Sequence, residues 1–494
     1  MSDRRDLVRG IDRRSVLKQG ILGAAGAVVA GGARASRSRE DCAVAVIGAG
    51  ISGLSAAREL KRAGINDFVV LEARDRVGGR TLNADIGGGH VTELGGQWIG
   101  PTQTAVADLA RELGLELFLT NKVGKTAFVA GGKVDYVDTS ALIDPTFAQT
   151  IDALAASIPL DAPWAHPDAA KLDAMTYADW LATQPLTDEQ KWTVRLGAML
   201  TYGAPPEALS WLWTLFYARS AGSYAELEGT AGEGAQTYRV VGGSQALSLA
   251  MARELGAKVR LATPVATIRD WGSTARCTIE TPSRKFIAQR VIVALSPSQA
   301  ELIAFDPPLP DERRDLQKAW PSAVDAMKAF LVYDEPFWRA AGLSGQSFLV
   351  DPSAPYGFGW DNSPPDGGRG VLACFINMPT ATRWPMEERR AAMIAAVTQC
   401  FGAKASNPLA YYEHKWLAEQ YTRGCISPLP PGVLTRCGPA LRPALGAIEW
   451  AGSETAHVWN GYMDGAVRAG REAAQRTLRS LFFGPSRIHL RPLG

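Results

Sequence analysis

The stretch AVAVIGAGISG, residues 43–53, predicts a buried strand, a glycine-rich turn and the beginning of a helix. Gly48 permits the tight turn, and Gly50 lets a pyrophosphate approach the backbone. Gly53 lets the helix and the strand pack closely. The first turn of the helix, with Ser52, offers unpaired N–H groups to phosphate oxygens. This stretch therefore predicts a nucleotide-binding turn.

A second strand-like run, Phe68 to Leu71, follows the helix and ends in Glu72. Together the three segments form a β-α-β unit. Glu72 lies about twenty residues after Gly50, where an acid is expected to bind ribose hydroxyls. Dinucleotide binding is the prediction, and a glycine-rich turn without a ligand is the alternative.

The residues after Glu72 favour FAD over NAD. In LEARDRVGGRT (71–81), two adjacent glycines let Arg80 fold back towards the diphosphate, where a guanidinium suits phosphate oxygens. This run resembles the flavin-binding branch of the fold. LGGQWIGPTQ (94–103) follows, and its glycine pair would let the backbone approach a flat ring. The candidate cofactor contacts in these two runs are Ala73, Arg74, Arg80, Gly95, Gly96, Gln97 and Trp98.

Later segments return to the same domain, whereas the segments between them are richer in aromatic residues and lack the β-α-β signature. The predicted fold class is α/β: a Rossmann-like FAD-binding domain interleaved with an α+β substrate-binding domain. We expect the FAD-binding domain to comprise residues 41–117, 241–316 and 419–481, and the substrate-binding domain residues 118–240 and 317–418, with a C-terminal tail at 482–494.

Composition excludes several classes of function. The 494 residues carry 52 basic and 50 acidic side chains, so the net charge of +2 gives no electrostatic case for nucleic acid or an anionic membrane. The six cysteines form no CxxC pair, and the five histidines are scattered. We therefore expect no metal site and no disulfide scaffold.

The N-terminus resembles a twin-arginine export signal at residues 1–35. Arg13-Arg14 precede a weakly apolar, Gly/Ala-rich stretch that ends in Ala33-Arg34-Ala35, a small-x-small cleavage pattern. A disordered basic tail is the alternative. The apolar stretch is too short and too glycine-rich to anchor the chain stably in a bilayer. We expect the twin-arginine machinery to export the folded protein, with its cofactor, to the periplasm.

The chain resembles the flavin-dependent amine oxidases, the family that includes the monoamine oxidases, from about Cys42 to Leu481. The resemblance is strongest in VAVIGAGISGLSAA, VVLEARDRVGGRT, GGQWIGPTQ, VYDEPFW and AGSETAHVWNGYMDGAVRAG. It implies FAD, with the flavin ring at the junction of the two domains. It also implies hydride transfer from the α-carbon of an amine, giving an imine that hydrolyses to an aldehyde or ketone. Molecular oxygen, reduced to hydrogen peroxide, or an electron-carrier protein would then take the electrons.

The resemblance assigns candidate catalytic residues. Lys328, in DAMKAFLVYDEPFW, occupies the place of a lysine joined through water to the flavin; an exposed residue on an alternating strand is the alternative. Tyr462, in WNGYMDG, would be one wall of an aromatic cage over the flavin, with Trp459 beside it; a core tyrosine is the alternative. The helix beginning near Met463 would point at the flavin pyrimidine. Further implied cofactor contacts are Val265, Ser453 and Glu454.

Cys425, in EQYTRGC, matches the position where monoamine oxidases carry a thioether to the flavin, so covalent FAD is one expectation and a small buried hydrophobic residue the other. Ile426 stands where those enzymes have a tyrosine, which departs from the family cage. Trp213, Tyr217 and Trp416 are the other candidates for the substrate pocket.

The substrate must react as a neutral amine, because hydride departure needs the nitrogen lone pair. Tyramine-like amines, putrescine-like diamines and alkaloid-derived secondary amines such as pseudooxynicotine are candidates. The last is favoured because bacterial alkaloid oxidases of this family often carry twin-arginine leaders. A flavin desaturase or porphyrinogen oxidase, and a non-catalytic flavin-binding protein, are the alternatives. A homodimer is left open.

Overall fold

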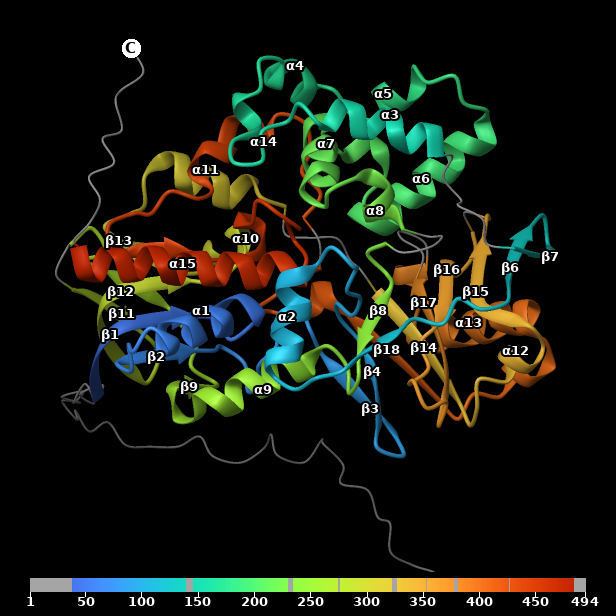
Figure 1. The fold of residues 1–494 in the computed structure, drawn as a ribbon, viewed down its shortest axis with the longest axis horizontal. Coiled ribbons are helices and arrows are strands. Elements are labelled where there is room, and N and C mark those ends of the chain that lie inside the picture. The colour runs from blue at the N-terminus through green and yellow to red at the C-terminus, as the bar shows by residue number, and fades with distance from the viewer. Residues whose placement is uncertain are drawn as a thin grey trace, which may run out of the picture. The chain divides into compact units, whose positions relative to one another are not determined.

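The computed structural model describes residues 38–138, 145–229, 234–273, 276–321, 327–351, 353–376, 381–425 and 427–483. The predicted export signal at 1–35, the tail beyond residue 483 and Ile426 lie outside these residues. From Ser38 onward the chain forms one compact unit. Its strands make two large sheets, to which the helices add a third, helical layer (Figure 1).

The first sheet has eight strands in the order β13-β10-β11-β12-β1-β2-β9, with β19 beside β12. Its strands are β1 (Ser38–Ile47), β2 (Phe68–Leu71), β9 (Val259–Arg260), β10 (Thr267–Arg269), β11 (Cys277–Glu280), β12 (Arg284–Val293), β13 (Ala304–Asp306) and β19 (Ile448–Trp450). Helix α1 (Ile51–Arg62) connects β1 to β2, which pair in parallel. The predicted β-α-β unit is therefore confirmed.

Strand β1 lies in the interior of the first sheet, and both of its faces are apolar. Val44 and Val46 pack into one buried cluster, and Ala45 and Ile47 into another on the opposite face. A strand that is covered on both faces has a continuous run of apolar residues in its sequence, as AVAVI does. Three helices, α1, α9 (Gln245–Leu255) and α15 (Met463–Phe483), pack together on the first of these faces (Figure 1).

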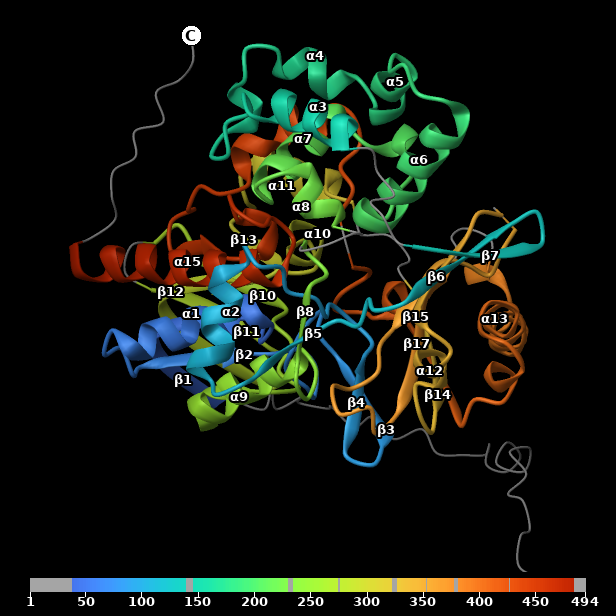
Figure 2. The same ribbon diagram turned by 45° about the vertical axis from the view of Figure 1, so that its right-hand side comes forward.

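The second sheet has seven strands in the order β18-β14-β17-β16-β15-β6-β7. Its strands are β6 (Lys125–Ala130), β7 (Lys133–Val137), β14 (Met327–Tyr333), β15 (Leu343–Leu349), β16 (Tyr356–Asp361), β17 (Gly370–Ile376) and β18 (Ala410–Lys415). One face packs on α12 (Phe337–Ala340) and α13 (Met386–Phe401). The other face meets residues near the hairpin of β3 (Asn83–Gly87) and β4 (His90–Glu93), and Figure 2 shows this hairpin and α13 on opposite sides of the sheet.

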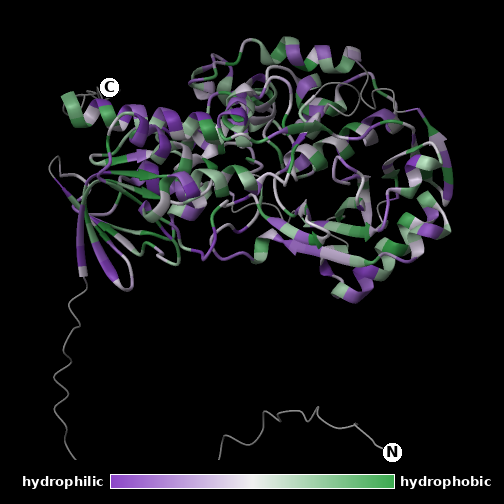
Figure 3. Cartoon of the chain, turned by 60° about the horizontal axis from the view of Figure 1, so that its bottom comes forward, coloured by the Kyte–Doolittle hydropathy of each residue, from purple (hydrophilic) through white to green (hydrophobic). Residues whose placement is uncertain are grey.

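The third layer is helical. It contains α3 (Pro145–Ala155), α4 (Ala169–Ala174), α5 (Tyr177–Ala182), α6 (Asp188–Tyr202), α7 (Trp211–Ser220) and α8 (Tyr224–Glu228), and α11 (Asp311–Ala319) and α14 (Val433–Cys437) pack against it. Two α-helices remain among the described residues: α2 (Thr104–Glu112) packs on α15, and α10 (Pro297–Ala300) packs on α11. A short antiparallel ladder joins β5 (Leu117–Leu119) to β8 (Tyr238–Val240). Hydrophobic and hydrophilic residues are interspersed along most helices (Figure 3). Helix α7 is an exception, because nine of its ten residues are buried.

The strands of each large sheet come from distinct stretches of sequence. Every strand of the second sheet lies within 118–240 or 317–418, and every strand of the first lies in the remaining described stretches. The exact domain boundaries stay a prediction. Among the described residues, no helix is long and apolar enough to cross a bilayer, and no group of His, Cys, Asp and Glu side chains is arranged to hold a metal ion.

Candidate active site

A cavity of about 820 Å³ lies where the two sheets and the helical layer meet. Most of the candidate site residues line it. They are Gly48, Gly50, Ser52, Glu72, Ala73, Arg74, Arg80, Gly95, Gly96, Gln97, Trp98, Tyr217, Val265, Lys328, Trp416, Cys425, Ser453, Glu454, Tyr462 and Met463. Three candidates, Gly53, Trp213 and Trp459, are not among its lining residues. Ile426 is outside the described part of the chain, so its expected place in the pocket stays a prediction.

The glycine turn is fixed by close backbone packing. Gly48 has φ 100°, and a Cβ there would lie 2.9 Å from the carbonyl oxygen of Ala294. A Cβ at Gly53 would overlap the carbonyl oxygen of Gly48. Gly50 differs, because a Cβ there would meet nothing nearer than the Cα of Gly79, at 3.7 Å, and the residue lines the cavity. Gly48 and Gly53 thus hold the turn together, while Gly50 keeps its surface open.

Glu72 ends β2 and ties the turn to the following loop. Its carboxylate accepts hydrogen bonds from the backbone N–H groups of Ala49, at 2.7 Å, and Arg74, at 3.0 Å. The side chain is buried yet lines the cavity. It therefore presents negative charge at the end of β2, where the ribose was expected.

Arg80 connects three segments at the cavity wall. Its guanidinium lies 2.7 Å from the carboxylate of Glu454 and donates to the Ser453 hydroxyl, also at 2.7 Å. It donates as well to the carbonyl oxygen of Cys425, at 3.1 Å. The Cys425 side chain is partly exposed and lines the cavity. Burial raises the pKa of the Cys425 thiol, and the cations of Arg80 and Lys328 oppose that rise.

Lys328 is buried by the alternation of β14. Met327 and Ala329 point towards α13, so Lys328 points the other way, towards the loop after β4. Its ammonium donates to the carbonyl oxygen of Gly95 and to Oε1 of Gln97, each at 2.6 Å. It is 7% exposed, so the alternative of an exposed strand lysine does not hold.

Three aromatic rings surround the Lys328 ammonium. The rings of Trp98, Trp360 and Phe375 have their centroids 5.5–5.8 Å from Nζ. Burial lowers the pKa of Lys328 to about 8, while the charge of Glu93 acts in the opposite direction. The lysine therefore releases its proton more readily than an exposed lysine does.

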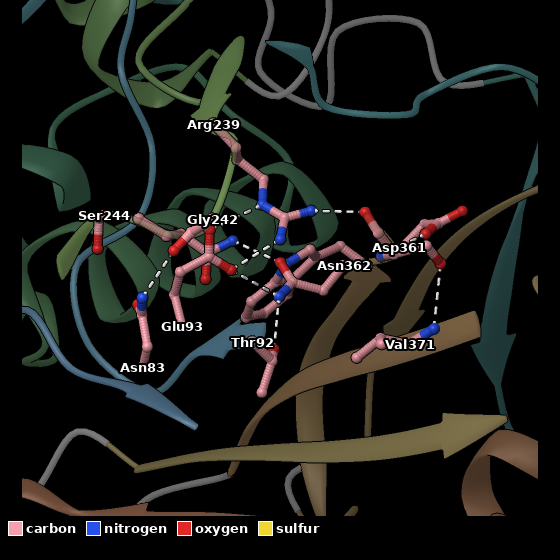
Figure 4. A network of polar contacts seen from close by, with 12 residues as sticks. Asn83, Thr92, Glu93, Arg239, Gly242, Ser244, Asp361, Asn362 and Val371 are labelled. Atoms are coloured by element: carbon pink, nitrogen blue, oxygen red, sulfur yellow. Dashed lines mark hydrogen bonds and ion pairs between the residues drawn. The ribbon is translucent and has the colours of Figure 1, made fainter. Parts of the chain in front are cut away.

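A buried polar network holds the side chain of Gln97. Figure 4 shows its members Glu93, Arg239 and Asn362. Nε2 of Gln97 donates to Oδ1 of Asn362 at 2.7 Å, and Nδ2 of Asn362 donates to Oε2 of Glu93 at 3.1 Å. Glu93 in turn forms an ion pair of 2.7 Å with Arg239, with both side chains at most 3% exposed. This network fixes the orientation of the amide that binds Lys328.

Aromatic residues form the opposite side of the cavity. The rings of Tyr217 and Tyr462 have their centroids 5.9 Å apart, and both line the cavity. Trp459 lies behind them, because its ring packs edge-on against Tyr462 at 4.9 Å and is 1% exposed. Trp213 is likewise a core residue that packs against Tyr217 at 5.5 Å. Trp459 and Trp213 can thus affect the cavity only through the two tyrosines.

Trp416 covers the glycine pair after β4. Its Nε1 donates to the carbonyl oxygen of Leu94 at 2.9 Å, and a Cβ at Gly95 would lie 2.9 Å from its ring. Gly95 is therefore required for this contact.

The sequence analysis missed much of the cavity wall. Apolar side chains from α6 and from the second sheet line it, namely Phe128, Trp192, Leu196, Phe348, Phe358 and Phe375. Trp192, Leu196 and Met199 recur at helical spacing along α6, which was the available signal. Glu228, at the end of α8, and the Arg239–Glu93 pair carried no such pattern.

The residues around the cavity fit FAD. The N-terminus of α1 carries no side-chain cap, so its N–H groups can bind a diphosphate beside Gly50. Trp98 lines the same cavity, and its buried Nε1 has no hydrogen-bond partner among the described residues. The cavity also continues past the glycine turn to Lys328 and Tyr462, which leaves space for a flat ring between two domains' residues.

Comparisons with known proteins agree with this fit. The family model described as flavin containing amine oxidoreductase matches residues 51–478. A Mycobacterium tuberculosis protein with the provisional name flavin-containing monoamine oxidase AofH is 37% identical over 440 residues, which cover 87% of this chain and 95% of that protein. The flavin-containing amine oxidase B of Sus scrofa is 35% identical over 460 residues, which cover 89% of this chain and 86% of the relative.

Solved structures give the same result. Wild-type putrescine oxidase bound to putrescine superposes with a TM-score of 0.82 at 34% identity, covering 89% of this chain and 99% of the other. The resemblance inferred from the motifs is thus confirmed. The chain belongs to the flavin containing amine oxidoreductase family: it is an enzyme that uses FAD to oxidise amines.

Proposed function

We propose that the protein is an oxygen-dependent oxidase of amines whose substituent is apolar and large enough to fill the side of the cavity remote from the glycine turn. The observation that carries this proposal is the single cavity that joins the glycine turn, Lys328 and the Tyr217–Tyr462 pair to the apolar wall. When bound, FAD supplies the acceptor for the hydride of the amine α-carbon.

The apolar wall favours the reactive form of the substrate. An amine enters from water mostly as the ammonium ion, which is costly to desolvate among Phe348, Phe358 and Leu196. The wall therefore lowers the pKa of the bound amine and favours the neutral form, whose lone pair the reaction needs. The rings of Tyr217 and Tyr462 add electron-rich faces for the amine nitrogen and exclude water.

Lys328 is held ready to position a proton or a water molecule at the edge of the ring. Gly95 and Gln97 accept hydrogen bonds from its ammonium at 2.6 Å, and the carbonyl oxygen of Glu93 accepts a weaker one at 3.5 Å. With a pKa near 8, the side chain is mainly an ammonium at neutral pH and can still release a proton. Such a group near the ring edge suits the proton transfers that accompany reduction of oxygen to hydrogen peroxide.

The substrate class narrows to three candidates: aryl-alkylamines, diamines and alkaloid-derived secondary amines such as pseudooxynicotine. The aromatic wall supports an arene-bearing substrate, and one similar structure holds putrescine. A role in amine catabolism would follow from any of the three.

A panel of these amines tests the proposal directly. We expect amine-dependent oxygen uptake by the purified holoenzyme with an equal amount of peroxide, and faster turnover for arene-bearing amines than for methylamine. Turnover supported by a dye acceptor but not by oxygen would refute the proposed acceptor. Equal rates for methylamine and for the larger amines would refute the role of the apolar wall.

We also propose export by the twin-arginine route, on the strength of Arg13-Arg14 and the Ala33-Arg34-Ala35 pattern. Residues 1–40 fused to a reporter should reach the periplasm, and replacing Arg13 and Arg14 by lysine should keep the reporter in the cytoplasm. Export that survives both replacements would refute this route.

A further inference from the structure

Glu228 is an acidic side chain in the cavity that the reaction described above does not use. It ends α8 and lines the cavity next to Gly229 and Thr201, and it is 5% exposed. Thr201 forms a hydrogen bond with the carboxyl group, but the oxygen Oε1 has no partner among the described residues. A buried carboxyl oxygen without a partner is costly, so an unpartnered oxygen on a residue that lines the cavity calls for a ligand group.

The surroundings of Glu228 supply no positive charge. Within the described part of the chain, no lysine, arginine or histidine forms an ion pair with it. The titratable groups whose charges it influences are four tyrosines, Tyr177, Tyr202, Tyr224 and Tyr462. Burial accordingly raises the pKa of Glu228 to about 7.

Other buried acids of the molecule are neutralised differently. Glu93, Asp361, Glu454 and Asp464 each lie within 2.7 Å of a nitrogen of an arginine side chain. Even Glu226, two residues before Glu228 on the same short helix, accepts a hydrogen bond from Thr102 at 2.9 Å. Glu228 therefore differs from these acids in lining the cavity with no arginine beside it and with one oxygen that has no hydrogen-bond partner among the described residues.

We propose that Glu228 binds a second basic nitrogen of the substrate, distinct from the nitrogen whose α-carbon is oxidised. A cationic nitrogen would give Oε1 the charge-assisted hydrogen bond that the protein does not provide. The proposal rests on the proposed function, because it assumes that the amine occupies this cavity. It narrows the substrate to amines that carry a second basic centre on an apolar body.

Two matched pairs of amines test this inference. Putrescine and pentylamine have equal length but end in an ammonium and a methyl group, and para-xylylenediamine and para-ethylbenzylamine differ in the same way. Binding is measured by calorimetry on anaerobic holoenzyme reduced with dithionite, which cannot oxidise the amine. The variants are Glu228→Gln and, as the matched control on the same helix, Glu226→Gln.

In the wild-type protein at about pH 8, we expect the diamine of at least one pair to bind about tenfold or more tightly than its isostere. Glu228→Gln should abolish this preference and change the affinity for the isostere by less than about threefold, whereas Glu226→Gln should retain the preference. An unchanged preference in Glu228→Gln, an equal loss for both members of a pair, or no preference in the wild-type protein would each overturn the inference. Because binding is measured without turnover, failure to oxidise any amine would contradict the proposed function instead.

Discussion

The glycine-turn side of the cavity and the substrate side differ in how far apart in the chain their residues lie. Gly48, Gly50, Gly53 and Glu72 belong to one β-α-β unit, and contacts inside it place Gly53 and Glu72. Gly48 also packs against the carbonyl oxygen of Ala294, just after β12. The substrate side gathers α6, α8, strands of the second sheet and the start of α15. A site built from local backbone geometry tolerates little change, whereas a site built from distant side chains can change its substrate while keeping the fold.

The strongest test of this contrast is on the glycine turn. Gly53→Val should destabilise the protein by more than about 4 kcal/mol, because even its Cβ would overlap the carbonyl oxygen of Gly48. Little soluble, flavin-containing protein is expected. Gly272→Ala is the control, since a Cβ at Gly272 meets no atom within 4 Å and the residue is not among those that line the cavity. A yellow, folded Gly53→Val protein would contradict the account of the turn.

The next largest effect is expected at Lys328. Lys328→Met removes the only charged group that Gly95 and Gln97 hold at this wall, within the described residues, and should slow turnover about 100-fold or more. The loss should appear in the reoxidation of the flavin by oxygen, followed by stopped-flow absorbance. Lys318→Met, at an exposed position of α11, should behave as the wild type. Unchanged reoxidation in Lys328→Met would remove its assigned role.

Replacing Cys425 tests whether FAD is attached covalently to the cavity wall. We predict that FAD is attached to its sulfur, so that the yellow colour stays with the protein after acid precipitation. Cys425→Ala should then release all of its flavin on the same treatment, while Cys437→Ala, which changes a buried cysteine in α14, should not. If the wild-type protein also releases all of its flavin, Cys425 serves only as a small side chain in the wall.

The smallest effect concerns stability and pH at Glu228. Burial raises the pKa of Glu228 from 4.5 to about 7, so the folded protein retains a proton that the unfolded chain releases between these values. The stability this proton contributes is present below pH 4.5 and is lost as the pH rises through about 7. Glutamine does not titrate, so Glu228→Gln does not lose stability in this way. The free energy of unfolding of Glu228→Gln, minus that of the wild type, should therefore rise by up to about 3 kcal/mol between pH 5 and 8.

Chemical denaturation at several pH values measures this difference, with Glu226→Gln analysed in parallel. A stability difference that does not depend on pH would mean that Glu228 is not held in the environment described here.

Sequence reasoning was most successful where spacing alone constrains the chain. Gly48 and Gly53 could be placed because each answers a steric demand of the turn, and Gly50 because the motif spacing puts it at the cofactor. The buried Lys328 could be suspected because a lysine is unusual in an apolar strand, and β14 buries it as that argument requires.

The rest depended on tertiary contacts that spacing does not encode. Trp213 and Trp459 were placed in or next to the pocket, but an aromatic residue near a site packs equally well behind it, as both do. Gln97 was foreseen as a flavin contact but not as the acceptor for Lys328, because Lys328 is 231 residues away in the sequence. Glu228 was missed because nothing in its local sequence shows that its neighbours carry no positive charge.

The most direct test of the central claim is an anaerobic titration of the holoenzyme with para-xylylenediamine, followed by the visible absorbance of the flavin. If the glycine turn and the apolar wall serve one reaction in one cavity, the amine should bleach the oxidised flavin completely, with one flavin reduced per amine group oxidised, and oxygen should restore the colour. Flavin that stays oxidised in the presence of this amine and of the other amines of the panel would contradict the account.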